Sequence, residues 1–236
     1  MILQAALATF LTLVSFGYLI IPISPQIMGK AIQKVHTKEK VVALTFDDGP
    51  NPPYTNELLE VLKKHEVKAT FFVLGKYIKN YPDAVKQIYQ AGHELGNHTW
   101  SHNYMIFKSC KTIRKEIDST DKAIRDLGYT GIIYFRAPHG AKLISLPMVL
   151  SKQNRAHILF NVIAWDWTQP GVKKIVNNVM KSVKPGSIIL LHDGDGAKDK
   201  ADRSQTVKAT DIIIQKLKQQ NYKIVTISEL LKFDSK

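Results

Sequence analysis

Strand-like and helix-like segments alternate from Lys40 onward, and this alternation limits the possible folds more than any other feature of the chain. Short apolar runs typical of buried strands occur at residues 41–46, 69–73, 93–96, 132–135, 157–163, 187–191 and 223–226. Helical patterns occur at 55–65, 81–91, 112–127, 146–153, 172–183 and 206–219, and a short helix is expected near the end. Such alternation predicts an α/β fold with parallel strands and right-handed crossovers. About seven units favour a closed or nearly closed β/α barrel, with an open doubly wound sheet as the alternative.

Polar clusters follow five of the predicted strands. They are TFDDGP (45–50), NHTWSH (97–102), FRAPHG (135–140), AWDW (164–167) and LLHDG (190–194). Strand ends often carry turn residues, so a single cluster would have a structural explanation. In both candidate folds, however, active sites lie at the carboxyl ends of the strands. Five clusters at this one edge therefore predict a functional site there.

Two of the histidines have a spacing suited to a metal ion. His98 and His102 are four residues apart, so on one helical turn they would share a face. This spacing alone is common in surface or core histidine pairs. With one carboxylate from the same edge, the set would suit a catalytic zinc, and it would equally suit the iron of a non-haem oxygenase.

The neighbouring residues favour hydrolysis over oxygenation. Asp47 and Asp48 are adjacent, so one can bind a metal while the other accepts a proton from water. Arg136 can hold a carboxylate in place through its planar guanidinium. His192 can act as a general acid if a carboxylate such as Asp166 raises its pKa. A base, an acid and a metal together are the requirements for hydrolysis of a polarised carbonyl.

The five motifs, in this order and spacing, resemble the polysaccharide deacetylases of the NodB-homology type, carbohydrate esterase family 4. The resemblance covers residues 40–233 and implies a distorted (β/α)7-type barrel, as in glycoside hydrolase and deacetylase folds. It implies removal of N-acetyl groups from amino-sugar polymers or oligomers, by an aspartate base, a histidine acid and a metal-bound water. One divalent ion is expected, with Zn²⁺ as the default and Co²⁺, Ni²⁺ or Fe²⁺ as alternatives.

The resemblance also assigns roles to individual residues. It implies that Asp47 is the base, that Arg136 tethers it, that His192 is the acid and that Asp166 is the partner of that acid. The implied metal ligands are Asp48, His98 and His102, and the implied walls of the acetyl pocket are Trp167 and Leu190. The backbone N–H of His139 would donate to the oxyanion. The chain departs from the family at His139, where an aromatic residue is common, and in a shortened fourth motif. Trp165 is expected to pack in the core on the same strand face as Trp167.

The substrate is left open by these motifs, since peptidoglycan, chitooligosaccharides, xylan and an exopolysaccharide all fit. The formal net charge is +13, which fits either a solvated basic surface or an anionic partner such as a wall polymer. No nucleic-acid partner and no obligate protein partner are expected. Cys110 is the single cysteine, so an intramolecular disulfide is excluded.

The amino terminus differs from the rest, because no charged side chain occurs from Ile2 to Ile27. Residues 1–27 are predicted to be a membrane anchor or a signal peptide, 28–39 a polar connector and 40–236 the catalytic domain. Lysines follow the apolar segment, which on the positive-inside rule would place the domain in the cytoplasm. Substrates of the resembling family usually lie outside the membrane. We therefore expect an anchored, extracytoplasmic domain, or a secreted one if the segment is cleaved.

Overall fold

The fold is built on one curled sheet of parallel strands, seen in a computed structural model that describes residues 31–140 and 145–235. The strand order is β1-β6-β5-β4-β3-β2-β8-β7, and β9 pairs with β2 beside this path. The strands are β1 (Ala31–Ile32), β2 (Val41–Asp47), β3 (Thr70–Val73), β4 (Glu94–Asn97), β5 (Tyr134–Phe135), β6 (His157–Ile158), β7 (Val162–Ile163), β8 (Ile188–His192) and β9 (Lys223–Val225). The two ends of this path, β1 and β7, do not pair within the described residues. The sheet is therefore an open, distorted barrel, and the predicted fold class is confirmed.

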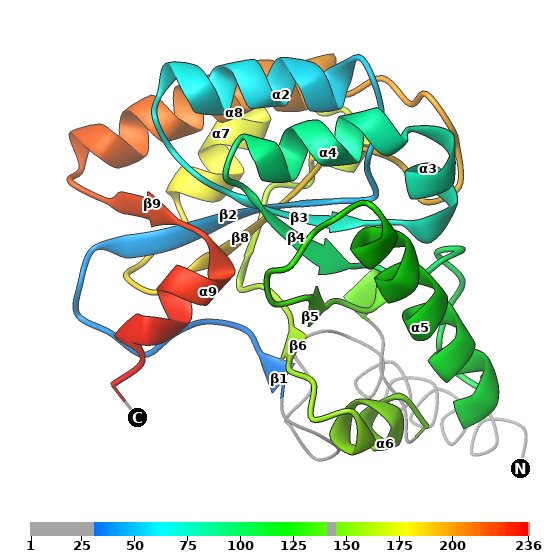
Figure 1. The fold of residues 1–236 in the computed structure, drawn as a ribbon. Coiled ribbons are helices and arrows are strands. Elements are labelled where there is room, and N and C mark those ends of the chain that lie inside the picture. The colour runs from blue at the N-terminus through cyan, green and yellow to red at the C-terminus, as the bar shows by residue number, and fades with distance from the viewer. Residues whose placement is uncertain (1–30, 141–144, 236) are drawn as a thin grey trace, which may run out of the picture.

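Helices surround the sheet, most of them on its outer face, whereas Ile227 and Leu230 of the last helix pack into an apolar cluster on the inner side. They are α2 (Tyr54–Lys64), α3 (Gly75–Asn80), α4 (Pro82–Gln90), α5 (Cys110–Asp126), α6 (Ser145–Lys152), α7 (Val172–Met180), α8 (Ser204–Gln219) and α9 (Ile227–Leu230), with the short 3₁₀ turns η1 (Pro138–Gly140), η2 (Asp166–Thr168) and η3 (Leu231–Phe233). In Figure 1, α2, α4, α7 and α8 lie together along one side, while α5 and α6 lie beside β5 and β6.

The alternation of side chains along β2 explains how the sheet positions polar groups. Val42, Leu44 and Phe46 belong to the large apolar cluster between the sheet and the helices. Ala43 belongs to a second cluster, on the inner side of the sheet. Because side chains alternate between the two faces of a strand, Asp47 also points inward, at the carboxyl end of β2.

The predicted strand 157–163 is wrong as a single element. It is two short strands, because the chain changes partners between them. Leu159 N–H donates to the Ile32 carbonyl at 2.7 Å, whereas Asn161 N–H donates to the Ile188 carbonyl at 3.2 Å. The first half thus belongs with β1 and the second half with β8. This change of partner bends the chain across the open side of the barrel.

The segment 28–39, predicted to be a polar connector, contributes to the sheet where it is described. Ala31 and Ile32 form β1, which pairs with β6. Val35 is buried in the inner apolar cluster. The helix α3 was not predicted, because Gly75 at its start and its length of six residues give a weak periodic signal. Helix α7 ends at Met180, three residues earlier than predicted.

No helix within 31–140 or 145–235 is long and apolar enough to cross a membrane. The predicted anchor or signal peptide at 1–27 lies outside the described residues.

Candidate active site

Three predicted metal ligands meet at the carboxyl edge of the sheet, which is the edge where β2, β4 and β8 end. One carboxylate oxygen of Asp48, Oδ1, lies 3.0 Å from Nε2 of His102 and 3.3 Å from Nε2 of His98. The three ligand atoms all lie within 4.8 Å of one another. Asp48 and His98 are buried and His102 is partly buried, so this cluster is largely shielded from water.

The two histidines converge through a loop, so the predicted helical turn is wrong. Residues 98–102 form no helix, and Thr99 and His102 both have left-handed backbone angles, with φ of 74° and 63°. Asn97 Oδ1 accepts the N–H of Thr99 at 2.8 Å, and Glu116 Oε2 accepts the N–H groups of Trp100 and Ser101 at 3.0 and 2.9 Å. Side-chain acceptors thus replace the carbonyls that a helix would supply.

The chemistry of these atoms fits a bound cation. Nδ1 of His98 lies 2.9 Å from the Arg136 carbonyl, so Nδ1 is the donor and Nε2 carries a lone pair in the neutral ring. Asp48 Oδ1 is buried and has no hydrogen-bond partner among residues 31–140 and 145–235. Burial opposes its charge, yet contacts with His102 and His98 hold the pKa of Asp48 well below its usual range. One anionic oxygen and two imidazole nitrogens thus converge as three possible ligand atoms. Such a set is typical of a divalent metal site.

Asp47 lies beside this cluster and is held by a buried arginine. Its Oδ1 accepts a hydrogen bond from Nη1 of Arg136 at 2.6 Å, and its Oδ2 lies 3.8 Å from Nε2 of His98. Arg136 is 0% exposed and lies with its guanidinium carbon 4.0 Å from the centroid of the Phe72 ring. One oxygen of Asp47 is therefore fixed, while the other faces the metal cluster.

The strand break described above is what anchors this arginine. Nε of Arg136 donates to the Ile158 carbonyl at 3.1 Å, and Nη2 donates to the Leu159 carbonyl at 3.2 Å. Nη1 also donates to Oγ1 of Thr45 at 2.8 Å. Each of the three guanidinium nitrogens thus has an acceptor, which offsets the cost of burying its charge.

Asp166 and His192 form a second pair at the same edge. Oδ1 of Asp166 lies 2.9 Å from Nδ1 of His192, and Oδ2 accepts the His192 backbone N–H and the Thr206 hydroxyl, each at 2.8 Å. Burial opposes the imidazolium, but the Asp166 carboxylate overcomes it and raises the pKa of His192 to about 9. His192 is therefore protonated at neutral pH, with Nδ1 directed at Asp166 and Nε2 on the opposite side of the ring.

His139 is near the metal cluster, but its side chain belongs to an aromatic stack. Its backbone lies in η1 with a left-handed φ of 59°. Its ring centroid is 4.6 Å from that of His102 and 3.7 Å from that of Tyr104. Burial and the neighbouring His102 lower the pKa of His139 to about 4. The role of its backbone N–H stays a prediction.

The predicted pocket residues border the acid side of the site. The Trp167 ring centroid lies 5.0 Å from that of His192, and the two rings are nearly perpendicular. Leu190 is buried in β8. The core position predicted for Trp165 is wrong, because its side chain is 50% exposed. The strand ends at Ile163, and Trp165 takes a left-handed conformation before η2, so the alternation expected of a strand is lost.

Sequence reasoning assigned no role to Asp193, the last acid of the fifth motif. Asp193 is buried, accepts the Thr55 hydroxyl at 2.6 Å and donates its backbone N–H to the Asp47 carbonyl. Burial raises its pKa to about 7. A Cβ built on Gly49 would overlap the Asp193 carboxylate, so Gly49 permits the close contact between β8 and the turn after β2. The signal available in the sequence was its place next to His192.

The sequence motifs also gave no indication of the place of Gly196. A Cβ built on Gly196 would lie 1.8 Å from Nδ1 of His102, so the loop after β8 packs directly against His102. Lys76 and Tyr77 of α3 hold this loop through the carbonyls of Gly196 and Asp195, at 2.5 and 2.9 Å.

Comparison with known proteins agrees with this geometry. The family described as polysaccharide deacetylase matches residues 34–156. A peptidoglycan-N-acetylglucosamine deacetylase of Bacillus cereus is 38% identical over 210 residues, which are 87% of this chain and 94% of the relative. The chain therefore belongs to the polysaccharide deacetylase family.

Two solved structures show both the likeness and its limit. The Bc1960 peptidoglycan N-acetylglucosamine deacetylase, in complex with 4-naphthalen-1-yl-N-oxidanyl-benzamide, has a TM-score of 0.82 at 32% identity, covering 89% of this chain and 95% of that one. A family pseudoenzyme from Bacillus anthracis has a TM-score of 0.79 at 32% identity, covering 87% of this chain and 70% of that one. Since the family includes a pseudoenzyme, activity has to be argued from the residues of the site.

Proposed function

We propose that this protein is a metal-dependent deacetylase that removes N-acetyl groups from an amino-sugar polymer, with peptidoglycan N-acetylglucosamine as its main substrate. One observation carries this proposal. The tethered carboxylate Asp47 and the protonated His192 lie at the same edge of the sheet as the cluster of Asp48, His98 and His102. The site thus holds a proton acceptor, a proton donor and a metal ligand set together.

The ligand set supports zinc as the bound metal. Two imidazole nitrogens and one carboxylate oxygen suit a catalytic Zn²⁺ that keeps an open coordination position. When bound there, such an ion supplies Lewis-acid polarisation of a carbonyl and acidifies water. The same ligands accept Co²⁺, Ni²⁺ or Fe²⁺, so the metal has to be identified by loading the protein with each.

Asp47 is proposed to be the general base. Its Oδ1 is held by Arg136, so the carboxylate cannot rotate freely, and its Oδ2 faces the metal cluster. A water attacking an acetyl carbonyl at this cluster would lie within reach of Oδ2, which can accept its proton. Arg136 compensates the negative charge of Asp47 while the neighbouring Asp48 serves the metal.

His192 is proposed to be the general acid. Its Nδ1 is occupied by Asp166, which leaves Nε2–H as the proton donor to the leaving amine. Collapse of the tetrahedral adduct breaks the C–N bond, and the proton from Nε2 produces the free amine and acetate. The His139 backbone N–H is proposed to donate to the oxyanion, and Trp167 and Leu190 to enclose the acetyl methyl group.

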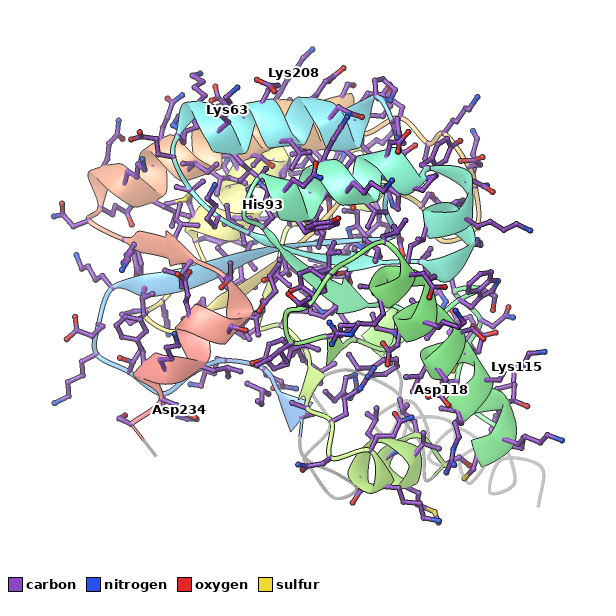
Figure 2. The ribbon with its side chains drawn as sticks, viewed as in Figure 1. Lys63, His93, Lys115, Asp118, Lys208 and Asp234 are labelled. Atoms are coloured by element: carbon purple, nitrogen blue, oxygen red, sulfur yellow. The ribbon has the colours of Figure 1, made fainter. Side chains whose placement is uncertain are left out.

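Two features support peptidoglycan over a neutral polymer. The B. cereus relative is named for peptidoglycan N-acetylglucosamine. The chain has a formal net charge of +13, and basic side chains such as Lys63 on α2 and Lys208 on α8 extend from the outer helices (Figure 2). A basic surface favours approach to an anionic wall polymer. Chitooligosaccharides and acetylated xylan are the alternatives to be tested.

A peptidoglycan substrate supports the proposal that the domain lies outside the cytoplasmic membrane. Residues 1–27 would then serve as an anchor, or as a signal peptide if they are cleaved. Protease treatment of intact cells producing the full chain tests this. Digestion of the domain is expected, and a domain protected until the cells are lysed would overturn the proposed location.

The proposed activity is tested by measuring acetate released by the zinc-loaded protein from peptidoglycan, N-acetylglucosamine oligomers and acetylated xylan. We expect release from peptidoglycan, and its loss in His192→Gln, which keeps a similar volume but cannot form an imidazolium. Release from xylan alone would replace the N-deacetylase with an O-deacetylase. Absence of release from all three substrates would contradict the proposed activity and favour a catalytically silent relative.

A further inference from the structure

Exposed aromatic side chains flank the active site, one on the metal side and one on the acid side, and the mechanism above uses neither. Tyr104 is 56% exposed and Trp165 is 50% exposed. Removing a large aromatic ring from water lowers the free energy, so a ligand that covers such a ring is bound more tightly. Exposed rings beside a catalytic site therefore often mark a ligand surface. The ring of His139 lies between Tyr104 and the proposed metal ligand His102. In the same way, the ring of Trp167 lies between Trp165 and the proposed acid, His192.

On the metal side, Tyr104 lies on the loop between β4 and α5. Its ring stacks on His139 with a centroid distance of 3.7 Å and an angle of 15° between the ring planes. The ring of His139 in turn contacts His102 at 4.6 Å. One face of Tyr104 is therefore covered by His139, while more than half of the side chain is open to a ligand.

On the acid side, Trp165 lies between β7 and η2. Its ring centroid is 4.8 Å from that of Trp167, which contacts His192 at 5.0 Å. The backbone of Trp165 has a φ of 59°, a conformation that bulky residues rarely adopt. This conformation leaves the ring half-exposed beside the acid instead of in the core.

The chemistry of a glycan suits these two surfaces. A pyranose ring presents patches of C–H groups between its hydroxyls, and these patches pack against the face of an aromatic ring through dispersion. The central sugar of a polymer would carry the acetyl group into the site. Its neighbours along the chain would then reach the rings on either side.

We propose that Tyr104 and Trp165 bind the sugars on either side of the one that is deacetylated. The enzyme then prefers an N-acetylated glycan of at least three sugars over a shorter one. This inference rests on the proposed function, because it takes the glycan to be the substrate of the same site. It adds two specificity residues, Tyr104 and Trp165, that take no part in the chemical step.

A purely structural role for Trp165 makes a different prediction. Because Trp165 contacts Trp167, and Trp167 contacts His192, its loss could disturb the acid. That disturbance would reduce turnover of every substrate, whatever its length. Loss of a sugar contact instead reduces kcat/KM for long substrates and leaves the shortest one unchanged.

The experiment compares kcat/KM for the N-acetylglucosamine hexamer and monomer in the zinc-loaded protein. For Trp165→Ala and Tyr104→Ala, we expect the ratio of hexamer to monomer to fall about 10-fold, mainly through KM. Trp165→Phe should recover most of the ratio, since it keeps an aromatic face. Ile132→Ala is the matched control, because Ile132 is 61% exposed but precedes β5 and so lies away from the carboxyl edge.

An unchanged ratio in both alanine variants, or an equal loss with both substrates, would overturn the inference. A wild-type protein that releases no acetate would instead contradict the proposed function. In that case, calorimetric titration with the hexamer still decides the inference. Binding weakened about 10-fold by Trp165→Ala would support it, and binding that is unchanged or absent in the wild type would overturn it.

Discussion

Buried acidic residues occur at both the amino and the carboxyl edge of the sheet, and the two groups are satisfied in different ways. At the amino end, Glu94 begins β4 and accepts the Thr70 hydroxyl at 2.8 Å, and Ser228 at the start of α9 donates to it through both its hydroxyl and its backbone N–H. At the carboxyl edge, Oδ1 of Asp48 faces two imidazole nitrogens and has no hydrogen-bond partner in the part of the chain that the structure describes.

The comparison shows what separates a structural acid from a functional one. Both groups are buried, and both lie at strand ends. The donors around Glu94 come from the protein itself, so this carboxylate joins α9 to the sheet and needs no ligand. Asp48 and the two imidazole nitrogens that face it can all act as acceptors, so a bound cation is needed to satisfy them. Convergence of unsatisfied ligand atoms, rather than burial, marks the candidate active site.

The largest effect should come from removing Asp47, the proposed base at the carboxyl edge. Asp47→Asn keeps the size of the side chain but removes its ability to accept a proton, so we expect kcat to fall about 1000-fold. Steady-state acetate release measures this. Bound zinc should stay near the wild-type level, because Asp47 is not a proposed ligand. Wild-type turnover in this variant would contradict the assigned base.

The next effect should come from Gly196, which allows the loop after β8 to pack on His102, a proposed metal ligand. The Cβ of Gly196→Ala would overlap His102, so the ring has to move. We expect zinc affinity to fall by up to about 100-fold, as measured by competition with a chelator. Unchanged affinity would show that the loop, rather than His102, yields to the added methyl group.

Asp166→Asn should produce a smaller effect that depends on pH. The carboxylate raises the pKa of His192 to about 9, so the acid is available below that value and is lost as the pH rises through it. Asparagine would remove the charge that offsets burial, so the pKa of His192 should fall to an ordinary histidine value of about 6.5 or below it. We expect kcat to fall at least roughly 30-fold at pH 8, with a smaller deficit at pH 6. A deficit that is equal at both pH values would contradict this account.

At the amino end, Glu94→Ala should leave catalysis unchanged and affect only stability. The donors of Thr70 and Ser228 would lose their acceptor, at a cost of about 2 kcal/mol in the free energy of unfolding. For a chain of this size we expect Tm to fall by roughly 5 °C, with kcat within about twofold of the wild type. Glu94→Gln is the matched control and should retain most of the stability. A large loss of kcat in Glu94→Ala would remove the distinction between the two ends.

Much of the fold was predictable, because strand and helix periodicities are local. The strand β2 and the helices α2, α4 and α5 lie within two residues of their predicted bounds. The division of 157–163 was not predictable from periodicity, because it depends on which distant strands, β1 and β8, offer hydrogen bonds. The short helix α3 and the strand β1 were missed for lack of a periodic signal.

The meeting of the candidate site's side chains at one edge of the sheet was predictable, whereas the geometry of the site was not, and the roles of the residues stay predictions. The parallel strands bring together three groups of side chains that the sequence predicted to meet. They are the predicted metal ligands, the pair of Asp47 and Arg136, and the pair of Asp166 and His192. The loop that carries His98 and His102 could not be inferred, because it depends on Glu116 from a later helix. The exposure of Trp165 likewise follows from a left-handed backbone that a strand pattern does not reveal.

The most direct test of the central claim is a zinc titration of the metal-depleted protein, with bound zinc and acetate release from peptidoglycan measured together. We predict that one equivalent of zinc binds and that activity rises in proportion to it. His98→Ala should bind little zinc and release little acetate at the same concentrations. Full acetate release by the metal-depleted wild type, or equal zinc binding by His98→Ala, would contradict the assignment of this site.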